Sequence, residues 1–289
     1  MMKCMQWFRE TLSLLENNIN PFKPWKNGTT RIKRNPQIIL SLTSHPGRIQ
    51  TVHRTIRTLL HQDYLPDRVV LWLAEEQFAA EEILPKKLLE LKKYGLEIRW
   101  CHDIRSYKKL VPALQEFPDA LVVTVDDDWY YRRDMLRVLI EEHERYPDEV
   151  ICHDITHPFL DEENHLRTSN ANHDYRGTSS FFNKILSGSG VLFSSSMLDP
   201  EVLKESVFMS EASTNDDIWF WAMAVKKGTK IRLAEKALGN TLMTDPEHQL
   251  STSLGIWNSS ENLYEKVTNR MLELYPEILE NLLEESKNK

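Results

Sequence analysis

The chain has 289 residues, the length of one large domain or of one domain with small terminal additions. Its net charge of −7 argues against a protein that binds nucleic acid by neutralising phosphates. Cys4, Cys101 and Cys152 show neither a disulfide framework nor zinc-ligand spacing, which indicates a reducing, cytoplasmic setting. No apolar run approaches the roughly 20 residues of a membrane span. Arg9 and Glu10 interrupt the N-terminal apolar stretch, so we expect no secretory signal.

Residues 1–36 are predicted to form an N-terminal helix followed by a basic linker. Apolar residues at helical spacing between Met5 and Leu15 predict the helix. Prolines and a glycine then end this pattern, and the linker contains five basic residues: Lys23, Lys26, Arg31, Lys33 and Arg34. We interpret the linker as solvated. The alternative is a peripheral contact with anionic lipid at the inner face of the cell membrane.

Strands and helices alternate from residue 37 onward. Short apolar runs predict strands, and longer amphipathic runs predict helices. The strands are expected at 38–42, 69–73, 96–101 and 121–125, and the helices at 49–62, 81–94, 107–117 and 132–146. This order predicts an α/β fold with a Rossmann-like, mostly parallel sheet that helices cover on both faces. Right-handed crossovers then place the carboxyl ends of the strands on one edge.

The second half of the chain is less regular. Strands are expected at 150–152 and 191–193, and helices at 214–227 and at 261–285 with an interruption near Pro276. Residues 153–187 are polar and carry no predicted element, and such long stretches in compact domains are usually functional or disordered. The predicted divisions are the N-terminal unit, the main α/β domain and a C-terminal helical extension: 1–36, 37–245 and 246–289.

Three consecutive aspartates, Asp126, Asp127 and Asp128, directly follow the apolar strand at 121–125. Unpaired charge is costly inside such a strand, so the acids must lie where the strand leaves the sheet. Three adjacent carboxylates repel one another unless a cation neutralises them, and hard oxygen ligands favour Mg²⁺, Mn²⁺ or Ca²⁺ over zinc. The alternative is helix capping, for which one acid is enough. We therefore predict a divalent metal that holds a phosphorylated ligand outside the strand ends.

Other polar residues follow the predicted strands on the same edge. Thr43 and Arg48 lie in the loop after the first strand, where Arg48 could pair with a diphosphate. Asp103, after the third strand, could accept hydrogen bonds from a base or ribose, and Lys108 or Lys109 could reach a phosphate. The alternatives are a polar turn with a surface arginine and a solvated helix start. The chain has neither a GxGxxG nor a GxxxxGK[ST] motif, so it shows no Rossmann dinucleotide site and no P-loop.

Asp216 and Asp217 form a second acidic site at the start of the helix at 214–227. One interpretation is capping, since acids suit the positive end of a helix. The other is a general base, because a poorly hydrated carboxylate has a raised pKa. Trp219 and Trp221 could present flat faces to a sugar, although a place in the core is the better interpretation for each. His248 could add a metal ligand, although a surface position is the simpler interpretation.

Taken together, the ordered motifs resemble those of glycosyltransferases with the GT-A fold, most closely small bacterial enzymes that build surface polysaccharides. The resemblance covers residues 38 to about 231 and rests on the following segments: Ser41-Leu42-Thr43-Ser44, Asp103 with Ser106-Tyr107-Lys108-Lys109, Val125-Asp126-Asp127-Asp128, Gly188-Ser189-Gly190 and Asn215-Asp216-Asp217-Ile218-Trp219. The chain departs from the family pattern in having Asn-Asp-Asp where Glu-Asp is usual.

The resemblance implies a nucleotide-sugar donor, expected to be a UDP-sugar, with Mn²⁺ or Mg²⁺ on its diphosphate. The acceptor would be a hydroxyl of a glycan or a lipid-linked glycan, and the anomeric centre would be inverted. In this family pattern Asp126 and Asp128 would bind the metal, with His248 as a candidate ligand, and Asp127 would help to place metal or ribose. Thr43, Arg48 and Asp103 would line the nucleotide, and the segment from Gly188 to Gly190 would approach donor and acceptor. Asp217 would be the general base, with Asp216 as second choice.

Two other classes of protein fit parts of this pattern. A sugar-phosphate nucleotidyltransferase also pairs a metal with phosphates at a strand edge, but it releases pyrophosphate. A non-catalytic module could bind a carbohydrate or nucleotide through Trp129, Trp219 and Trp221 without turnover. Mere binding needs no base, so the acidic pair at 216–217 disfavours the module.

Overall fold

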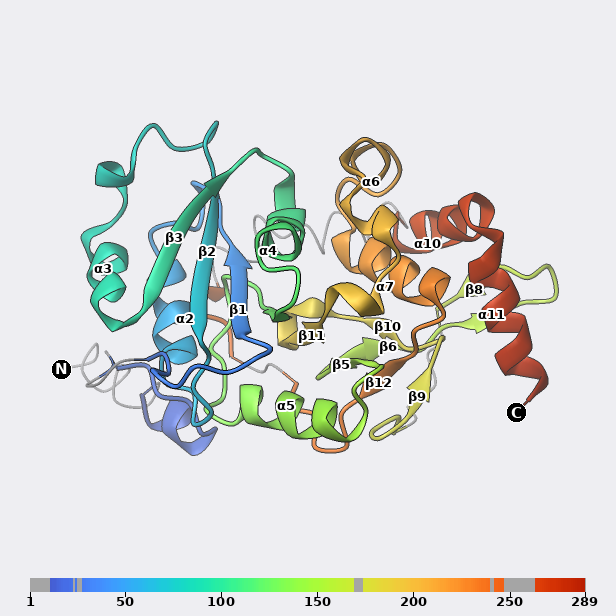
Figure 1. Cartoon of the computed structure of the whole chain (residues 1–289), viewed down its shortest axis with the longest axis horizontal. Coiled ribbons are helices and arrows are strands. Elements are labelled where there is room, and N and C mark those ends of the chain that lie inside the picture. Colours follow the sequence, from blue (N-terminus) through green and yellow to red (C-terminus); the bar gives the residue numbers. More distant parts are fainter. Residues whose placement is uncertain are drawn as a thin grey trace.

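An eight-stranded mixed sheet runs through the molecule in the computed structural model (Figure 1). The structure describes residues 11–22, 24, 28–168, 174–239, 242–246 and 263–288. The strand order is β3-β2-β1-β4-β11-β5-β12-β9. These strands span, in chain order, β1 Ile38–Thr43, β2 Arg68–Ala74, β3 Leu96–Cys101, β4 Leu121–Thr124, β5 Val150–Cys152, β9 Ser179–Ser180, β11 Val191–Phe193 and β12 Ile231–Leu233.

The sheet is mostly parallel, as predicted. The ladders β1–β2, β1–β4, β2–β3 and β5–β12 are parallel, whereas β11 lies antiparallel between β4 and β5, and β9 is antiparallel to β12. Strands β1, β2 and β4 are almost wholly buried, because parallel strands are covered on both faces and therefore need near-continuous apolar sequences. The predicted Rossmann-like α/β class is confirmed.

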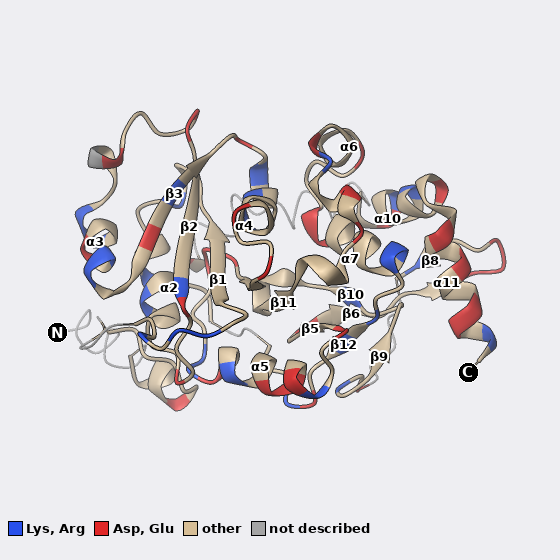
Figure 2. Ribbon diagram, in the orientation of Figure 1, with Lys and Arg blue, Asp and Glu red and all other residues tan. Residues whose placement is uncertain are grey.

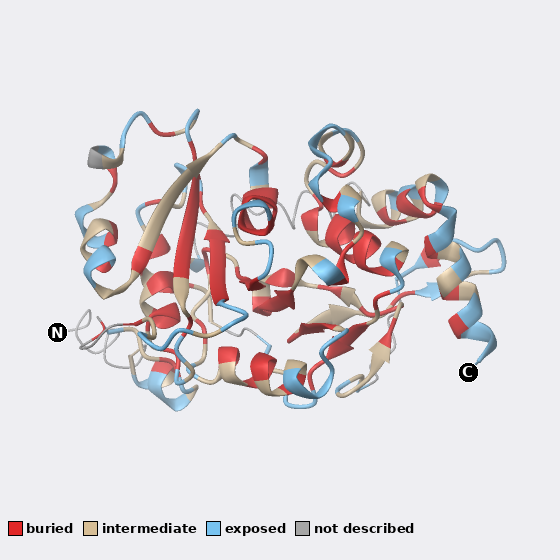
Figure 3. Cartoon of the chain, viewed as in Figure 1, coloured by how far each residue is buried: buried red, intermediate tan, exposed pale blue. Residues whose placement is uncertain are grey.

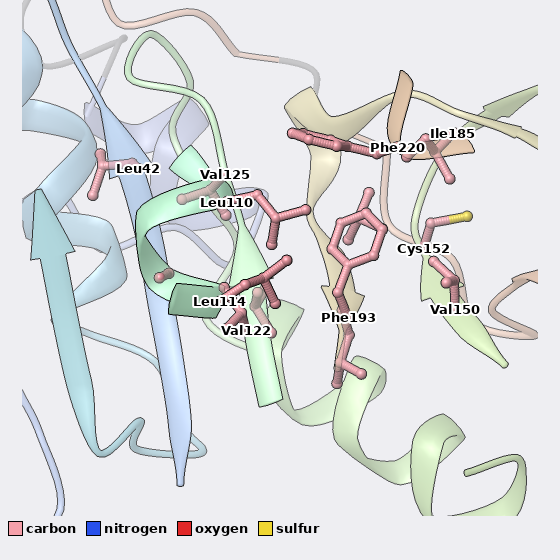
Figure 4. Packing of buried hydrophobic residues seen from close by; sticks show 14 of the residues in the cluster. Leu42, Leu110, Leu114, Val122, Val125, Val150, Cys152, Ile185, Phe193 and Phe220 are labelled. Carbon is pink, nitrogen blue, oxygen red and sulfur yellow. The ribbon is translucent and has the colours of Figure 1, made fainter. Parts of the chain in front are cut away.

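Helices cover both faces of this sheet. The hydroxyl of Ser41 donates to the carbonyl of Lys109 at 2.6 Å, so one face of β1 packs on the 3₁₀ segment η3, Arg105–Lys109. Side chains alternate along a strand, so Leu42 points to the other face, and Figure 4 shows Leu42 and Leu110 on opposite sides of β1. Around the other half of the sheet, α5 and α7 lie on opposite sides (Figure 1). The α-helices are α2 Val52–Leu59, α3 Lys86–Leu89, α4 Val111–Glu116, α5 Met135–Arg145, α6 Glu205–Glu211, α7 Asp216–Lys227, α10 Leu263–Leu274 and α11 Pro276–Lys287.

Two predicted helices are broken into shorter pieces. The stretch at 81–94 divides at Pro85 into a 3₁₀ turn, the short α3 and a second 3₁₀ segment, since proline offers no N–H to continue a helix. The stretch at 107–117 becomes η3 and α4, with Pro112 in the first turn of α4. Inside the polar region 153–187, short strands form two small antiparallel pairs: β6 Ile155–Thr156 with β10 Lys184–Ile185, and β7 Phe159–Leu160 with β8 Leu166–Arg167.

The core extends from the central sheet into the C-terminal helices. Trp219 and Trp221 are fully buried, and their indole N–H groups donate to the carbonyls of Val202 at 3.2 Å and Phe181 at 2.9 Å. Both tryptophans therefore belong to the core, which confirms that interpretation over a sugar-binding face. Helices α10 and α11 contact α7, and Figure 3 shows the buried stretch of α7 between them and the sheet. None of the helices in the described ranges is long and apolar enough to cross a membrane.

We expect Leu282→Ala to lower the free energy of unfolding by about 2–5 kcal/mol, because this fully buried side chain of α11 leaves a cavity in the shared core. Denaturant unfolding should still show a single transition if α11 folds with the main domain. The exposed neighbour Glu284 provides the control, and Glu284→Ala should change the free energy by less than about 0.5 kcal/mol. A separate early transition in the wild-type chain would contradict a shared core.

Candidate active site

The three aspartates lie where β4 leaves the sheet, as predicted. The N–H of Val125 still bonds to the carbonyl of Ser41 at 3.1 Å, and the chain then turns away from the ladder. Arg48 meets two of the acids here: its Nη1 lies 2.9 Å from Oδ1 of Asp127 and 2.8 Å from Oδ2 of Asp128. The hydroxyl of Ser44 donates to Oδ2 of Asp127 at 2.5 Å. The loop after β1 therefore neutralises part of the acidic turn, as expected for a loop at this edge.

Asp126 points in another direction, toward a buried lysine. Nζ of Lys109 lies 2.9 Å from Oδ1 of Asp126, 2.8 Å from Oδ2 of Asp216 and 3.7 Å from Oδ1 of Asp217. Its ammonium also donates to the hydroxyl of Ser187. The Lys109 side chain is only 5% exposed, so a single buried charge joins the acids after β4 to those at the start of α7.

The electrostatic balance keeps Lys109 charged. Burial alone would lower the pKa of its ammonium, but the negative charges of Asp126, Asp216 and Asp217 outweigh burial and leave the pKa well above its ordinary value. Lys109 was predicted to reach a phosphate of the ligand. In the structure its ammonium is instead bonded to protein carboxylates.

Asp217 has the properties of a general base. Burial raises its pKa to about 6; Lys109 opposes this shift, while Asp216 and Asp126 add to it. The N–H of Ser187 donates to Oδ2 of Asp217 at 3.1 Å and its hydroxyl donates to Oδ1, which holds the carboxylate in one orientation. The Asp217 side chain is 28% exposed, so a ligand could reach it.

Asp216 is more enclosed than its neighbour. Its side chain is 12% exposed, and Oδ1 accepts the hydroxyl of Ser106 at 2.7 Å while Oδ2 faces Lys109. These bonds suit a residue that holds Lys109 in place. The greater exposure and raised pKa of Asp217 favour Asp217 over Asp216 as a base.

The acidic cluster has the oxygen donors and the surplus negative charge that suit a hard divalent cation, but its carboxylates are turned toward Arg48 and Lys109. Five carboxylates (Asp126, Asp127, Asp128, Asp216 and Asp217) surround two cations, Arg48 and Lys109. Burial raises the pKa of Asp128 to about 7; Asp126 adds to this shift and Arg48 opposes it, as expected where negative charge is in surplus. Within the described ranges, no group of three or more His, Cys, Asp or Glu side chains is arranged to hold a metal ion. His248 lies outside the described residues.

Two other predicted residues make their hydrogen bonds away from this cluster. Thr43 donates its hydroxyl to the carbonyl of Trp72 at 2.9 Å. Asp103 accepts from Gln77 at 2.7 Å and from the ammonium of Lys108.

Gly190 also lies apart from the acids. It has φ +105°, and a Cβ there would meet Met135 Sδ at 3.2 Å, so this glycine serves the backbone turn into β11. The nearby Gly188 is the glycine that faces the acids: a Cβ there would lie 3.2 Å from Oδ2 of Asp126 and 3.4 Å from the indole nitrogen of Trp129.

Two residues of the site escaped sequence reasoning. Ser187 ends the long polar segment and directly precedes the Gly188-Ser189-Gly190 motif, but a serine in a polar stretch gives no sign that it will bond to a distant carboxylate. Tyr131 accepts the N–H of Asp126 at 2.8 Å and donates its hydroxyl to the carbonyl of Gly188 at 2.7 Å, which ties the acidic turn to the segment before β11. The bonds from Ser187 to Asp217 and from Tyr131 to Gly188 follow from the antiparallel direction of β11, whose amino end lies beside the carboxyl end of β4.

No protein-family model matches the chain, and no curated protein matches its sequence. The chain is similar to the mannosyltransferase PcManGT from Pyrobaculum calidifontis, in complex with GDP-Man and Mn²⁺, with 13% identity and a TM-score of 0.32 over 52% of this chain and 43% of that one. It is also similar to S. aureus TarS, with 14% identity and a TM-score of 0.48 over 84% of this chain and 70% of that one. Neither similarity is strong enough to assign an activity.

We expect Lys109→Met to lower the free energy of unfolding by about 3–5 kcal/mol near neutral pH, because it leaves buried carboxylates without their cation. Without that cation the folded acids hold protons more tightly than the unfolded ones. The deficit should therefore shrink as the pH falls from about 8 to about 5. Denaturant unfolding at several pH values measures both effects.

The neighbouring Lys108 provides the matched control. It is equally buried but pairs with the one acid Asp103, so the deficit of Lys108→Met should depend far less on pH. The same pH dependence in both variants would contradict the role of Lys109 as the shared cation of an acidic cluster.

Proposed function

We propose that this protein is a glycosyltransferase that moves a sugar from a nucleotide-diphosphate donor, a UDP-sugar, to a hydroxyl of a glycan or lipid-linked glycan. The observation that carries the proposal is the single ammonium of Lys109, which brings Asp126 and Asp217 into one cluster at the carboxyl edge of the sheet. One side of this cluster has the groups to hold an anionic leaving group, and the other has a carboxylate suited to take a proton. The GT-A-like order of motifs in the sequence supports the same reaction.

The donor side consists of the acidic turn after β4 and the loop after β1. Asp126 and Asp128 would hold Mn²⁺ or Mg²⁺, which when bound neutralises the charge that develops on the departing diphosphate. Arg48, already beside Asp127 and Asp128, would pair with a phosphate through its planar fork. Thr43 and Asp103 would line the nucleotide, and the loop at Gly188–Gly190 would approach the sugar.

The acceptor side is Asp217 with the residues that orient it. A neutral hydroxyl is a poor nucleophile, so a carboxylate must remove its proton as the new bond forms. Asp217 takes that proton, the acceptor oxygen bonds to the anomeric carbon, and the bond from that carbon to the diphosphate oxygen breaks. One displacement of this kind inverts the anomeric centre. The cysteine pattern supports a cytoplasmic setting for the reaction.

We expect Asp217→Asn to reduce the rate of sugar transfer by about 10²–10⁴-fold with little change in donor affinity, because the amide cannot accept the proton. The base works only when ionised. In the wild-type enzyme, kcat/KM should therefore rise with pH and level off above a pKa near 6. Steady-state kinetics across pH, with donor binding measured separately, checks the loss of rate in the variant and the pH profile of the wild-type enzyme. Near wild-type transfer by the variant would exclude Asp217 as the base.

We expect a panel of nucleotide-sugars, each with and without Mn²⁺, to contain one that raises the melting temperature. A donor at about 100 times its Kd stabilises the folded state by about 2.7 kcal/mol. Asp128→Ala should remain folded, lose the metal-dependent part of the shift and lose sugar transfer. The control is Asp119→Ala, which changes an exposed aspartate just before β4 and should keep both the metal-dependent shift and sugar transfer.

The possible results separate the parts of this proposal. Donor binding and transfer that persist in excess chelator would remove the metal from the mechanism but leave the transferase. Release of pyrophosphate would identify a nucleotidyltransferase instead. Binding without turnover of any donor would identify a binding module.

A further inference from the structure

We propose that this chain docks on an anionic lipid surface through a face built around its N-terminal segment, which we call the basic face. The basic face consists of four described stretches: 11–22, 28–36, 61–67 and 132–137. Hydrogen bonds join them: the N–H of Arg133 donates to the carbonyl of Asn18 at 2.8 Å, and the N–H of Asp63 donates to the carbonyl of Arg133 at 2.8 Å. Arg34 donates to Asp67 at 2.6 Å. The four stretches therefore form one continuous surface.

Exposed apolar side chains are concentrated on this face. Nine large apolar side chains are exposed in the described part of the chain, and the basic face holds five of them: Leu12, Leu15, Phe22, Ile32 and Leu65. Ile32 is the most exposed of all, at 76%. Leu12, Leu15 and Phe22 come from one stretch, whereas Ile32 lies between Arg31 and Lys33. Single apolar side chains of this kind suit insertion between lipid head groups.

The charge of the chain is divided in the same way. Residues 1–36 contain seven Lys and Arg against two acids, whereas residues 37–289 contain 29 against 41. Figure 2 shows Lys and Arg along the loop that leads into β1. The described stretches of the basic face hold six basic residues and four acids, so this region reverses the sign of an otherwise acidic molecule.

This division of charge selects the partner. An anionic membrane attracts the N-terminal segment and repels the rest of the chain, so charge favours one orientation on the surface. In a symmetric pair of copies, the same face of each would meet its like-charged counterpart. Lipid is therefore the occupant that both the exposed apolar side chains and the charges favour.

The position of the basic face makes this inference independent of the proposed function. The N–H of Asp67 donates to the carbonyl of Ile38 at 2.8 Å, which places the 61–67 loop at the amino ends of β1 and β2. The acidic cluster lies at the carboxyl ends of the strands. Docking can therefore be measured without donor, metal or turnover.

The test is flotation of the full-length protein with phosphatidylcholine vesicles that contain or lack phosphatidylglycerol. We expect binding only to the vesicles with phosphatidylglycerol, and weaker binding as the salt concentration rises. The double variant Ile32→Ser/Lys33→Glu should lower the partition coefficient at least about tenfold, because it removes an inserting side chain and reverses a charge.

The matched control is Ile83→Ser/Lys86→Glu, which changes an exposed isoleucine and an exposed lysine on another surface. It should bind the vesicles as the wild type does, and melting curves should show that both variants are folded. No binding of the wild type to the anionic vesicles, or an equal loss in both variants, would overturn the proposal. A dimer in solution that dissociates in the Ile32→Ser/Lys33→Glu variant would also overturn the proposal.

Discussion

The arrangement of the site depends on one buried positive charge. Carboxylates from two distant parts of the chain, Asp126 and Asp216, lie on either side of the ammonium of Lys109 at 2.9 and 2.8 Å. Without that charge, the end of β4 and the start of α7 would repel each other at their point of contact. The lysine comes from a third element, η3, so three segments that are far apart in sequence must fold together before the site exists.

The antiparallel strand β11 makes this meeting possible. A fully parallel sheet would place the segment before β11 at the amino edge, far from the aspartates. Because β11 runs the other way between β4 and β5, Ser187 and Gly188 arrive at the carboxyl edge. Ser187 can then hold Asp217 through its N–H and its hydroxyl, while Gly188 leaves space beside Asp126. The strand thus brings both an orienting group and a closely approaching glycine backbone to the acids.

The sequence was sufficient to predict the parallel half of the fold and to single out all five aspartates of the acidic cluster. Strong apolar runs mark β1 to β4, and their order specifies which edge carries Asp126 and Arg48. The direction of β11 could not be predicted, because three buried residues have no periodicity that reveals a partner strand. For the same reason Ser187 and Tyr131 were missed. Lys109 was recognised as part of the site, but its partners depend on tertiary contacts that no local pattern records.

The two proposed surfaces involve opposite ends of β1, because the 61–67 loop lies at its amino end and the acidic cluster at its carboxyl end. Their separation determines how far an acceptor must extend from a membrane. Strand β1 has six residues and so spans about 20 Å from its amino end to its carboxyl end. A protein held to a bilayer at the amino ends would carry its reaction centre about that far above the head groups. A water-dissolved donor would arrive unhindered, whereas a sugar attached directly to a lipid would be too short to enter. An acceptor anchored in the same bilayer would need several sugar units between its lipid and the reacting hydroxyl. The length of the strands would thereby favour glycan acceptors that already carry several sugars.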